Sequence, residues 1–164
     1  MSAAPKIENP LFDKRLLNAF ADGVTKTLQM MANTTVTYGK PTIETNYVLK
    51  GNIAGLVGMT APPLRGQLSL SFPKNSILLI VENMLGEKNT EITQEVSDAV
   101  GELTNMIYGT AKTTLNQLGY NFEMALPTVI NGDFNMKTPS AGATLVLPVK
   151  LSPTDEFFVG ISVS

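Results

Sequence analysis

Apolar residues recur at helical spacing in three stretches of the chain. From Leu11 to Ala32 they return every three or four residues, which predicts an amphipathic helix of about six turns. A short helix is predicted from Lys74 to Leu85, opened by Pro73 and closed by Gly86 as a left-handed cap. The most regular pattern runs from Thr93, a suitable N-cap, to Leu118. The chain therefore contains two long helices and one short one.

The remaining sequence is rich in Thr, Val and Tyr and alternates between apolar and polar residues, as strands do. The predicted strands are Thr34 to Glu44, Tyr47 to Met59, Leu64 to Phe72, Asn121 to Val129, Phe134 to Lys137, Ala143 to Leu151 and Glu156 to Ser164. Because strands and helices are segregated along the chain, we expect an α+β fold. Its mostly antiparallel sheet would pack against the three helices in a single domain spanning residues 1–164.

Composition excludes several functions. The chain has no His and no Cys, so a Ser-His-Asp triad, a Cys nucleophile and a His/Cys zinc site are all impossible. The net charge is −2 and the 12 Lys and Arg residues are scattered, which argues against a nucleic-acid partner. The apolar runs are too short to span a bilayer, and the N-terminus lacks a signal-peptide pattern. We therefore expect a cytoplasmic protein that does not bind a membrane.

The helix predicted from Thr93 to Leu118 carries the candidate chemistry. At 100° per residue, its polar face presents Asp98, Glu102, Asn105 and Gly109. The opposite, buried face would hold Val96, Val100, Leu103, Ile107, Ala111 and Leu118. Glu102 and Asn105 are about 4.5 Å apart along the axis, so a carboxylate and a carboxamide project side by side. Gly109 costs about 1 kcal/mol relative to Ala, which suggests that a partner needs room there.

A Glu-x-x-Asn string on an exposed helix face is common and by itself far more often has no function, and Asp98 with Glu102 is also typical of a solvated acidic strip. The methionines Met30, Met31, Met84 and Met106 are interpreted as core residues. The longer run from Asp98 to Lys112, followed by Pro127 to Gly132, is more specific.

This run resembles the CheX family of chemotaxis phosphatases, relatives of CheC and FliY. The family pattern is an Asp or Ser, three residues, a Glu, two residues, an Asn and then a Pro a little over twenty residues later. Asp98, Glu102, Asn105 and Pro127 take those places, with Pro127 one residue closer than usual. The resemblance extends over nearly the whole chain.

The resemblance implies an enzyme that hydrolyses the aspartyl-phosphate of a CheY-like response regulator. Asn105 would orient the attacking water and Glu102 would pair with a conserved receiver Lys, with Asp98 and Gly109 on the partner-binding face. The Mg²⁺ would belong to the receiver. The helix from Leu11 to Ala32 has no Glu-x-x-Asn string, so one site is expected.

The resemblance also implies a homodimer joined through sheet edges, for which the uncharged run Ala143 to Val149 is the candidate edge. The main alternative function is a non-catalytic receiver-binding or scaffold protein in two-component signalling. A structural component of the flagellar switch is disfavoured because no second domain is recognisable.

Overall fold

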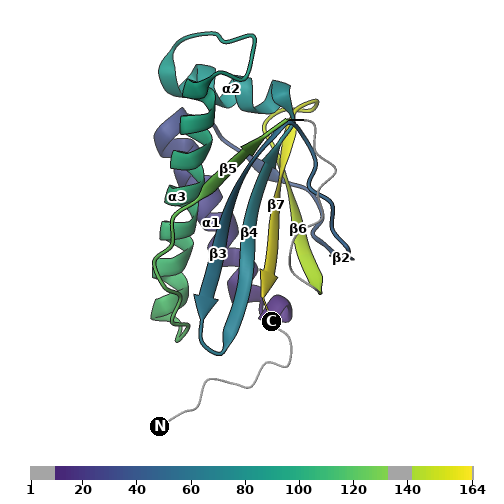
Figure 1. The fold of residues 1–164 in the computed structure, drawn as a ribbon, viewed down its shortest axis with the longest axis vertical. Coiled ribbons are helices and arrows are strands. Elements are labelled where there is room, and N and C mark those ends of the chain that lie inside the picture. Colours follow the sequence, from purple (N-terminus) through teal and green to yellow (C-terminus); the bar gives the residue numbers. More distant parts are fainter. Residues whose placement is uncertain (1–9, 133–141, 164) are drawn as a thin grey trace.

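A seven-stranded antiparallel sheet with three helices on one face makes up the protein in its computed structural model (Figure 1). The structure describes residues 10–132 and 142–163. The three helices are α1 (Lys14–Ala32), α2 (Lys74–Leu85) and α3 (Gln94–Gln117), and the short 3₁₀ turn η1 (Pro10–Phe12) precedes α1. The strands are β1 (Thr37–Tyr38), β2 (Thr42–Thr45), β3 (Ile53–Ala61), β4 (Leu64–Phe72), β5 (Thr128–Asn131), β6 (Ala143–Lys150) and β7 (Glu156–Val163). The predicted α+β class is confirmed.

The strand order is β1-β6-β7-β4-β3-β5, and β2 also pairs with β6. Strand β6 is therefore bonded to β7 on one side and to β1 and β2 on the other. The prediction that Ala143 to Val149 forms a free edge is wrong, because the short strands β1 and β2 already occupy its outer side. The two ends of the sheet are instead β1 with β2, and β5.

The long helices α1 and α3 pack against each other and cover the same face of the sheet (Figure 1). Glycines allow this close approach. A Cβ at Gly23 of α1 would lie 3.1 Å from the carbonyl oxygen of Ile107 in α3, and a Cβ at Gly55 of β3 would overlap the side chain of Thr104. Thr104 is fully buried, and its hydroxyl donates to the Val100 carbonyl at 2.7 Å. Small residues thus seat α3 directly on β3.

The opposite face of the sheet carries a smaller apolar cluster of Tyr47, Leu49, Ala54 and Val146. The segment from Tyr47 to Asn52 supplies the first two and does not pair as a strand, so the predicted strand Tyr47 to Met59 begins only at Ile53. Gly51, with φ of 115°, turns the chain into β3. An interior cluster therefore replaces strand pairing in this segment.

Three other predicted boundaries differ from the structure. The first helix begins at Lys14 because the Asp13 side chain accepts from the Arg15 amide and caps the helix. The strand predicted from Thr34 to Glu44 is divided into β1 and β2. Most of Asn121 to Val129 is irregular, and only its last two residues enter β5. The strand predicted from Phe134 to Lys137 lies outside the described residues.

Candidate functional site

Helix α3 presents the predicted polar face to solvent. Thr93 caps its N-terminus by accepting from the Val96 amide, and the predicted buried face is buried as far as Ala111. Leu118 is the exception, because it is the C-cap and its side chain is 41% exposed. Asp98, Glu102 and Asn105 are exposed and Gly109 is half-buried. The helix therefore brings together the four candidate residues on one accessible face.

Three of them, Asp98, Glu102 and Asn105, line a surface groove between α3 and the segment that leads into β5. The groove has a volume of about 440 Å³. Its α3 wall contains Asp98, Glu102 and Asn105, and its opposite wall contains Leu126 and Pro127. Pro127, chosen from the sequence pattern, thus faces the Glu-x-x-Asn pair across the groove.

Polar contacts connect the two walls of the groove. The Asn131 Nδ2 of β5 donates to the Ser97 Oγ of α3 at 2.9 Å, and Ser97 is buried. On α3 itself, Gln94 Nε2 donates to Asp98 Oδ1 at 2.9 Å. Sequence reasoning missed Asn131, because its approach to α3 depends on the pairing of β5 with β3 rather than on helical spacing.

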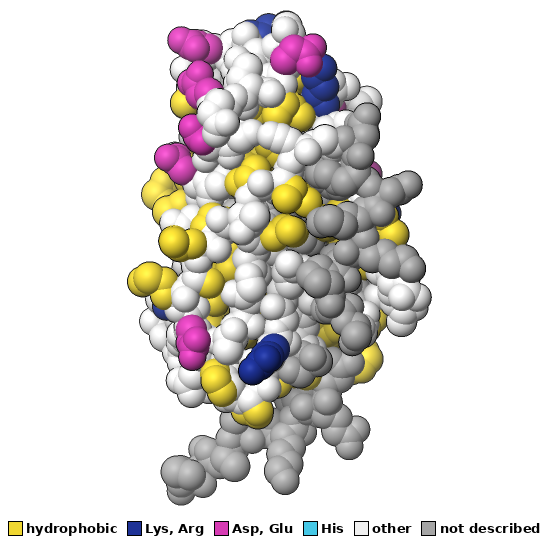
Figure 2. Space-filling model, in the orientation of Figure 1, with side chains coloured by type: hydrophobic (Ala, Val, Ile, Leu, Met, Phe, Trp, Pro, Cys, Tyr) yellow, Lys and Arg dark blue, Asp and Glu magenta, His cyan; other side chains and the backbone are white. Residues whose placement is uncertain are grey.

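Within the described part of the chain, no hydrogen bond or ion pair occupies the Glu102 carboxylate or the Asn105 carboxamide. Both groups are therefore available to an incoming partner. Figure 2 shows acidic side chains along the edge formed by the first half of α3, followed by hydrophobic side chains further along that edge. The acidic residues of α3 are Glu95, Asp98 and Glu102, all exposed in its first half, and they favour a cationic group in the partner.

The arrangement limits the chemistry of the site. A carboxamide can both accept hydrogen bonds through its oxygen and donate two through its nitrogen, so Asn105 can hold and orient a water molecule. Residues 10–132 and 142–163 contain no group of three His, Cys, Asp or Glu side chains that could hold a metal ion. None of the helices described by the structure is long and apolar enough to cross a membrane.

A second groove continues from the first along α3. It is lined by Asn105, Met106 and Gly109 on the helix and by Met124 and Leu126 on the facing segment, and its volume is about 430 Å³. Sequence reasoning placed Met106 in the core, but its side chain is 38% exposed, and Met30 on α1 is 70% exposed. Both assignments were wrong. The irregular backbone around Met124 gave no periodic signal from which its exposure could be predicted.

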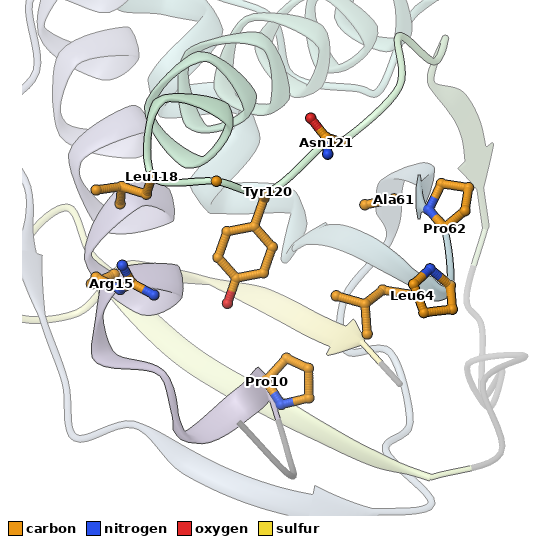
Figure 3. Close-up of a pocket in the computed structure, with 10 residues that line it drawn as sticks. Pro10, Arg15, Ala61, Pro62, Leu64, Leu118, Tyr120 and Asn121 are labelled. Atoms are coloured by element: carbon orange, nitrogen blue, oxygen red, sulfur yellow. The ribbon is translucent and has the colours of Figure 1, made fainter. Parts of the chain in front are cut away.

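A separate cavity of about 220 Å³ lies near the C-terminal end of α3 (Figure 3). The ring of Tyr120 projects into it between Arg15 and Leu64. The Tyr120 hydroxyl donates to Asp13 Oδ2 at 2.8 Å, and Arg15 makes two side-chain bonds to the same carboxylate. Burial and the adjacent Asp13 raise the pKa of Tyr120 to about 12. These polar groups are already engaged with one another, so we interpret the cavity as structural.

The family model described as "Chemotaxis phosphatase CheX" matches residues 53–150. The chain is similar to a CheC-like superfamily protein from Shewanella sp. PV-4, with 37% identity and a TM-score of 0.85 over 93% of this chain and 99% of that one. It is also 28% identical over 152 residues to the CheY-P phosphatase CheX of Thermotoga maritima, covering 92% of this chain and 97% of that protein.

A chain in the crystal structure of the CheX-CheY-BeF3-Mg²⁺ complex from Borrelia burgdorferi also has a similar fold. Its TM-score is 0.75 at 23% identity, over 90% of this chain and 97% of that one. The matched family region contains α3, with its Glu102 and Asn105, and the strands on which the helix is seated. The chain belongs to the CheX family of chemotaxis phosphatases.

Proposed function

We propose that this protein hydrolyses the aspartyl-phosphate of a CheY-like response regulator. Asn105 orients the attacking water, and Glu102 docks the receiver by pairing with one of its lysines. The observation that carries the proposal is the unengaged carboxylate and carboxamide, side by side on one exposed face of α3. The activity of the Thermotoga relative and the CheY partner in the Borrelia complex support the choice of substrate.

The reaction does not require a nucleophile from the enzyme. An acyl phosphate is already reactive, so positioning one water in line with the phosphorus is the main task. The water oxygen attacks phosphorus, the bond between phosphorus and the aspartyl oxygen breaks, and the aspartate leaves as a carboxylate. The protons of the water remain on the released phosphate or pass to solvent. Asn105 performs the positioning without being ionised or consumed.

We assign the Mg²⁺ of the reaction to the receiver. Mg²⁺ prefers six oxygen ligands in an octahedron and neutralises charge on the phosphoryl group. Asp98 and Glu102 are one helical turn apart on an open surface, and Asp98 already accepts from Gln94. In this proposal Asp98 adds negative charge beside Glu102 for the receiver lysine, and the missing side chain of Gly109 lets the partner approach α3.

The test combines turnover and binding. Purified protein is mixed with a phosphorylated CheY in Mg²⁺ and phosphate loss is followed, while affinity is measured with the stable BeF3⁻/Mg²⁺ form of the same CheY. We expect Asn105→Ala to lower kcat about 100-fold or more with unchanged affinity for CheY. The variant removes the group that orients the attacking water and leaves the docking contacts in place. We expect Glu102→Ala to weaken binding about two- to fivefold, because an exposed charge pair at the interface is lost.

Two matched controls accompany these variants. Asn18→Ala makes the same amide deletion on the exposed side of α1, and Glu87→Ala removes an exposed carboxylate between α2 and α3. Both should behave as wild type. Wild-type protein that binds CheY but leaves its phosphate lifetime unchanged would establish the alternative, a non-catalytic receiver-binding protein.

We also propose that the protein is a homodimer that pairs through β2. Among the described strands, β2 and β1 form one end of the sheet and β5 forms the other. Strand β5 contributes Val129 and Asn131 to the groove that contains Glu102 and Asn105. A second copy paired with β5 would therefore block access of the receiver to this groove. The end formed by β2 is remote from that groove in the strand order, and its Ile43 is 43% exposed.

A further inference from the structure

We infer that Met106, Met124 and Leu126 form a second docking surface, which binds an apolar area of the same receiver domain whose phosphorylated aspartate reaches Asn105. We call these three residues the apolar surface. The inference rests on the proposed function and adds to it the contact that supplies most of the affinity for the receiver.

The apolar surface is exposed to an unusual degree. The side chain of Met124 is 86% exposed, that of Leu126 is 80% exposed and that of Met106 is 38% exposed. They come from α3 and from a segment about twenty residues later, and they meet around one groove of about 430 Å³. Large apolar side chains that gather in this way on a globular protein mark an interaction site more often than isolated ones do.

The apolar surface is continuous with the proposed catalytic face. Asn105 and Leu126 line both the groove that contains Glu102 and the groove that contains Met106 and Met124. A receiver domain that places its aspartyl-phosphate against Asn105 therefore covers the apolar surface as well. Gly109 on the floor of the second groove leaves open space where a side chain would project, so a partner can come close to the helix.

The backbone that carries Met124 is held in place, so its exposure is not the result of a loose loop. The Tyr108 hydroxyl of α3 donates to the Glu123 carbonyl at 2.7 Å, and the Glu123 amide donates to the Thr60 carbonyl of β3 at 2.8 Å. Phe122, one residue earlier, is buried. A residue anchored on both sides in this way fixes where the next side chain points, and Met124 points to solvent.

Energetics favour an apolar contact beside the polar pair. Glu102 is exposed, and an exposed charge pair contributes little to binding because water screens it. Methionine and leucine bury substantial area in an interface, and methionine adapts to irregular partner surfaces. In this arrangement the polar pair provides orientation and chemistry, and the apolar surface provides most of the affinity.

The experiment measures kcat, KM and affinity for Met124→Ser, Leu126→Ser and the double variant. The substrate is a phosphorylated CheY encoded by the same genome, and the binding probe is its BeF3⁻/Mg²⁺ form. We expect the double variant to raise KM and Kd about tenfold or more with kcat at saturation unchanged. Asn105→Ala should instead lower kcat and leave KM and Kd unchanged. The control is Met30→Ser, which removes another highly exposed methionine, on α1, and should change neither constant.

The outcomes separate this inference from the proposed function. Unchanged KM and Kd in the double variant, with wild type active, would overturn the docking surface and leave the phosphatase proposal intact. A wild type that binds without hydrolysis would overturn the phosphatase, while a raised Kd in the double variant would still support the surface. If the double variant lost self-association but kept its receiver affinity, the surface would belong to a second copy of this chain and the inference would fail.

Discussion

A single carboxylate, Asp13, joins the beginning of α1 to the segment that follows α3. It caps α1 through the Arg15 amide, accepts two side-chain bonds from Arg15 and accepts a third from Tyr120. The bonds from the Arg15 side chain hold the pKa of Asp13 below its ordinary value of 3.8, against the opposing effect of burial. Because the folded pKa is lowered, Asp13 stabilises the fold fully above that ordinary value and ceases to do so as the pH falls through the folded pKa.

We predict that Asp13→Asn lowers the free energy of unfolding by about 1–3 kcal/mol at pH 7, since a charged cap and its hydrogen bonds are weakened. The cost should shrink as the pH falls from 3.8 through the folded pKa, because the wild-type carboxyl then becomes protonated in the folded state as well. Urea unfolding across this range measures it. Asp22→Asn, on the exposed side of α1, is the control and should change stability by less than about 0.5 kcal/mol. A cost independent of pH would contradict the assigned role of the charge.

Sequence reasoning could place Glu102 and Asn105 on one face because helical spacing is a local property. Their exposure follows from the apolar residues on the opposite side of α3. It could not find Asn131 or Leu126, which reach the groove only because β5 pairs with β3. The wall of the groove opposite α3 therefore depends on contacts between distant parts of the chain. A periodic pattern within one segment cannot predict such contacts.

At the scale of elements, the side chain of Asn116 holds the part of the irregular segment between α3 and β5 that contains Phe122. Asn116 Oδ1 accepts from the Phe122 amide at 2.8 Å, and Asn116 Nδ2 donates to the Phe122 carbonyl at 3.1 Å. These bonds take the place of strand pairing. They engage the backbone N–H and C=O of Phe122, which lies within the predicted strand Asn121 to Val129.

We predict that Asn116→Ala lowers the free energy of unfolding by about 1–3 kcal/mol, because both polar backbone groups of Phe122 lose their partner. Asn116→Asp is the matched variant, because it keeps the acceptor and loses the donor, and it should cost less. Chemical unfolding gives both values. If both variants proved as stable as wild type, the segment would be held by its other contacts alone.

The helix bounds were predicted well because their signals are local. Thr93 as N-cap and Gly86 as left-handed cap are both confirmed, and α2 has the predicted range Lys74–Leu85. The partners of β6 were not predictable in this way. The short β1 and β2 contain only two and four residues, so their sequence gives little indication that they cover the outer side of β6.

At the scale of the whole molecule, the proposed dimer can be tested at β2. Ile43→Glu places a charge on this exposed strand, and repulsion between two such charges across an interface should convert a dimer to a monomer. Sedimentation velocity measures the change. Phe12→Glu, on a side chain that is 69% exposed in η1, is the control and should remain dimeric. Wild-type protein that sediments as a monomer at every concentration would refute the dimer.

Placing Glu102 and Asn105 on the single helix α3 has a consequence for regulation. The distance between them is set by the hydrogen bonds within the helix backbone, so it survives any movement of α3 against the sheet. Movements of the molecule can reorient, cover or expose the pair, but they cannot change the spacing between its two residues. Control over such an enzyme has to act on access to the helix face, whereas a site assembled from several loops could be switched off by a small shift of one of them.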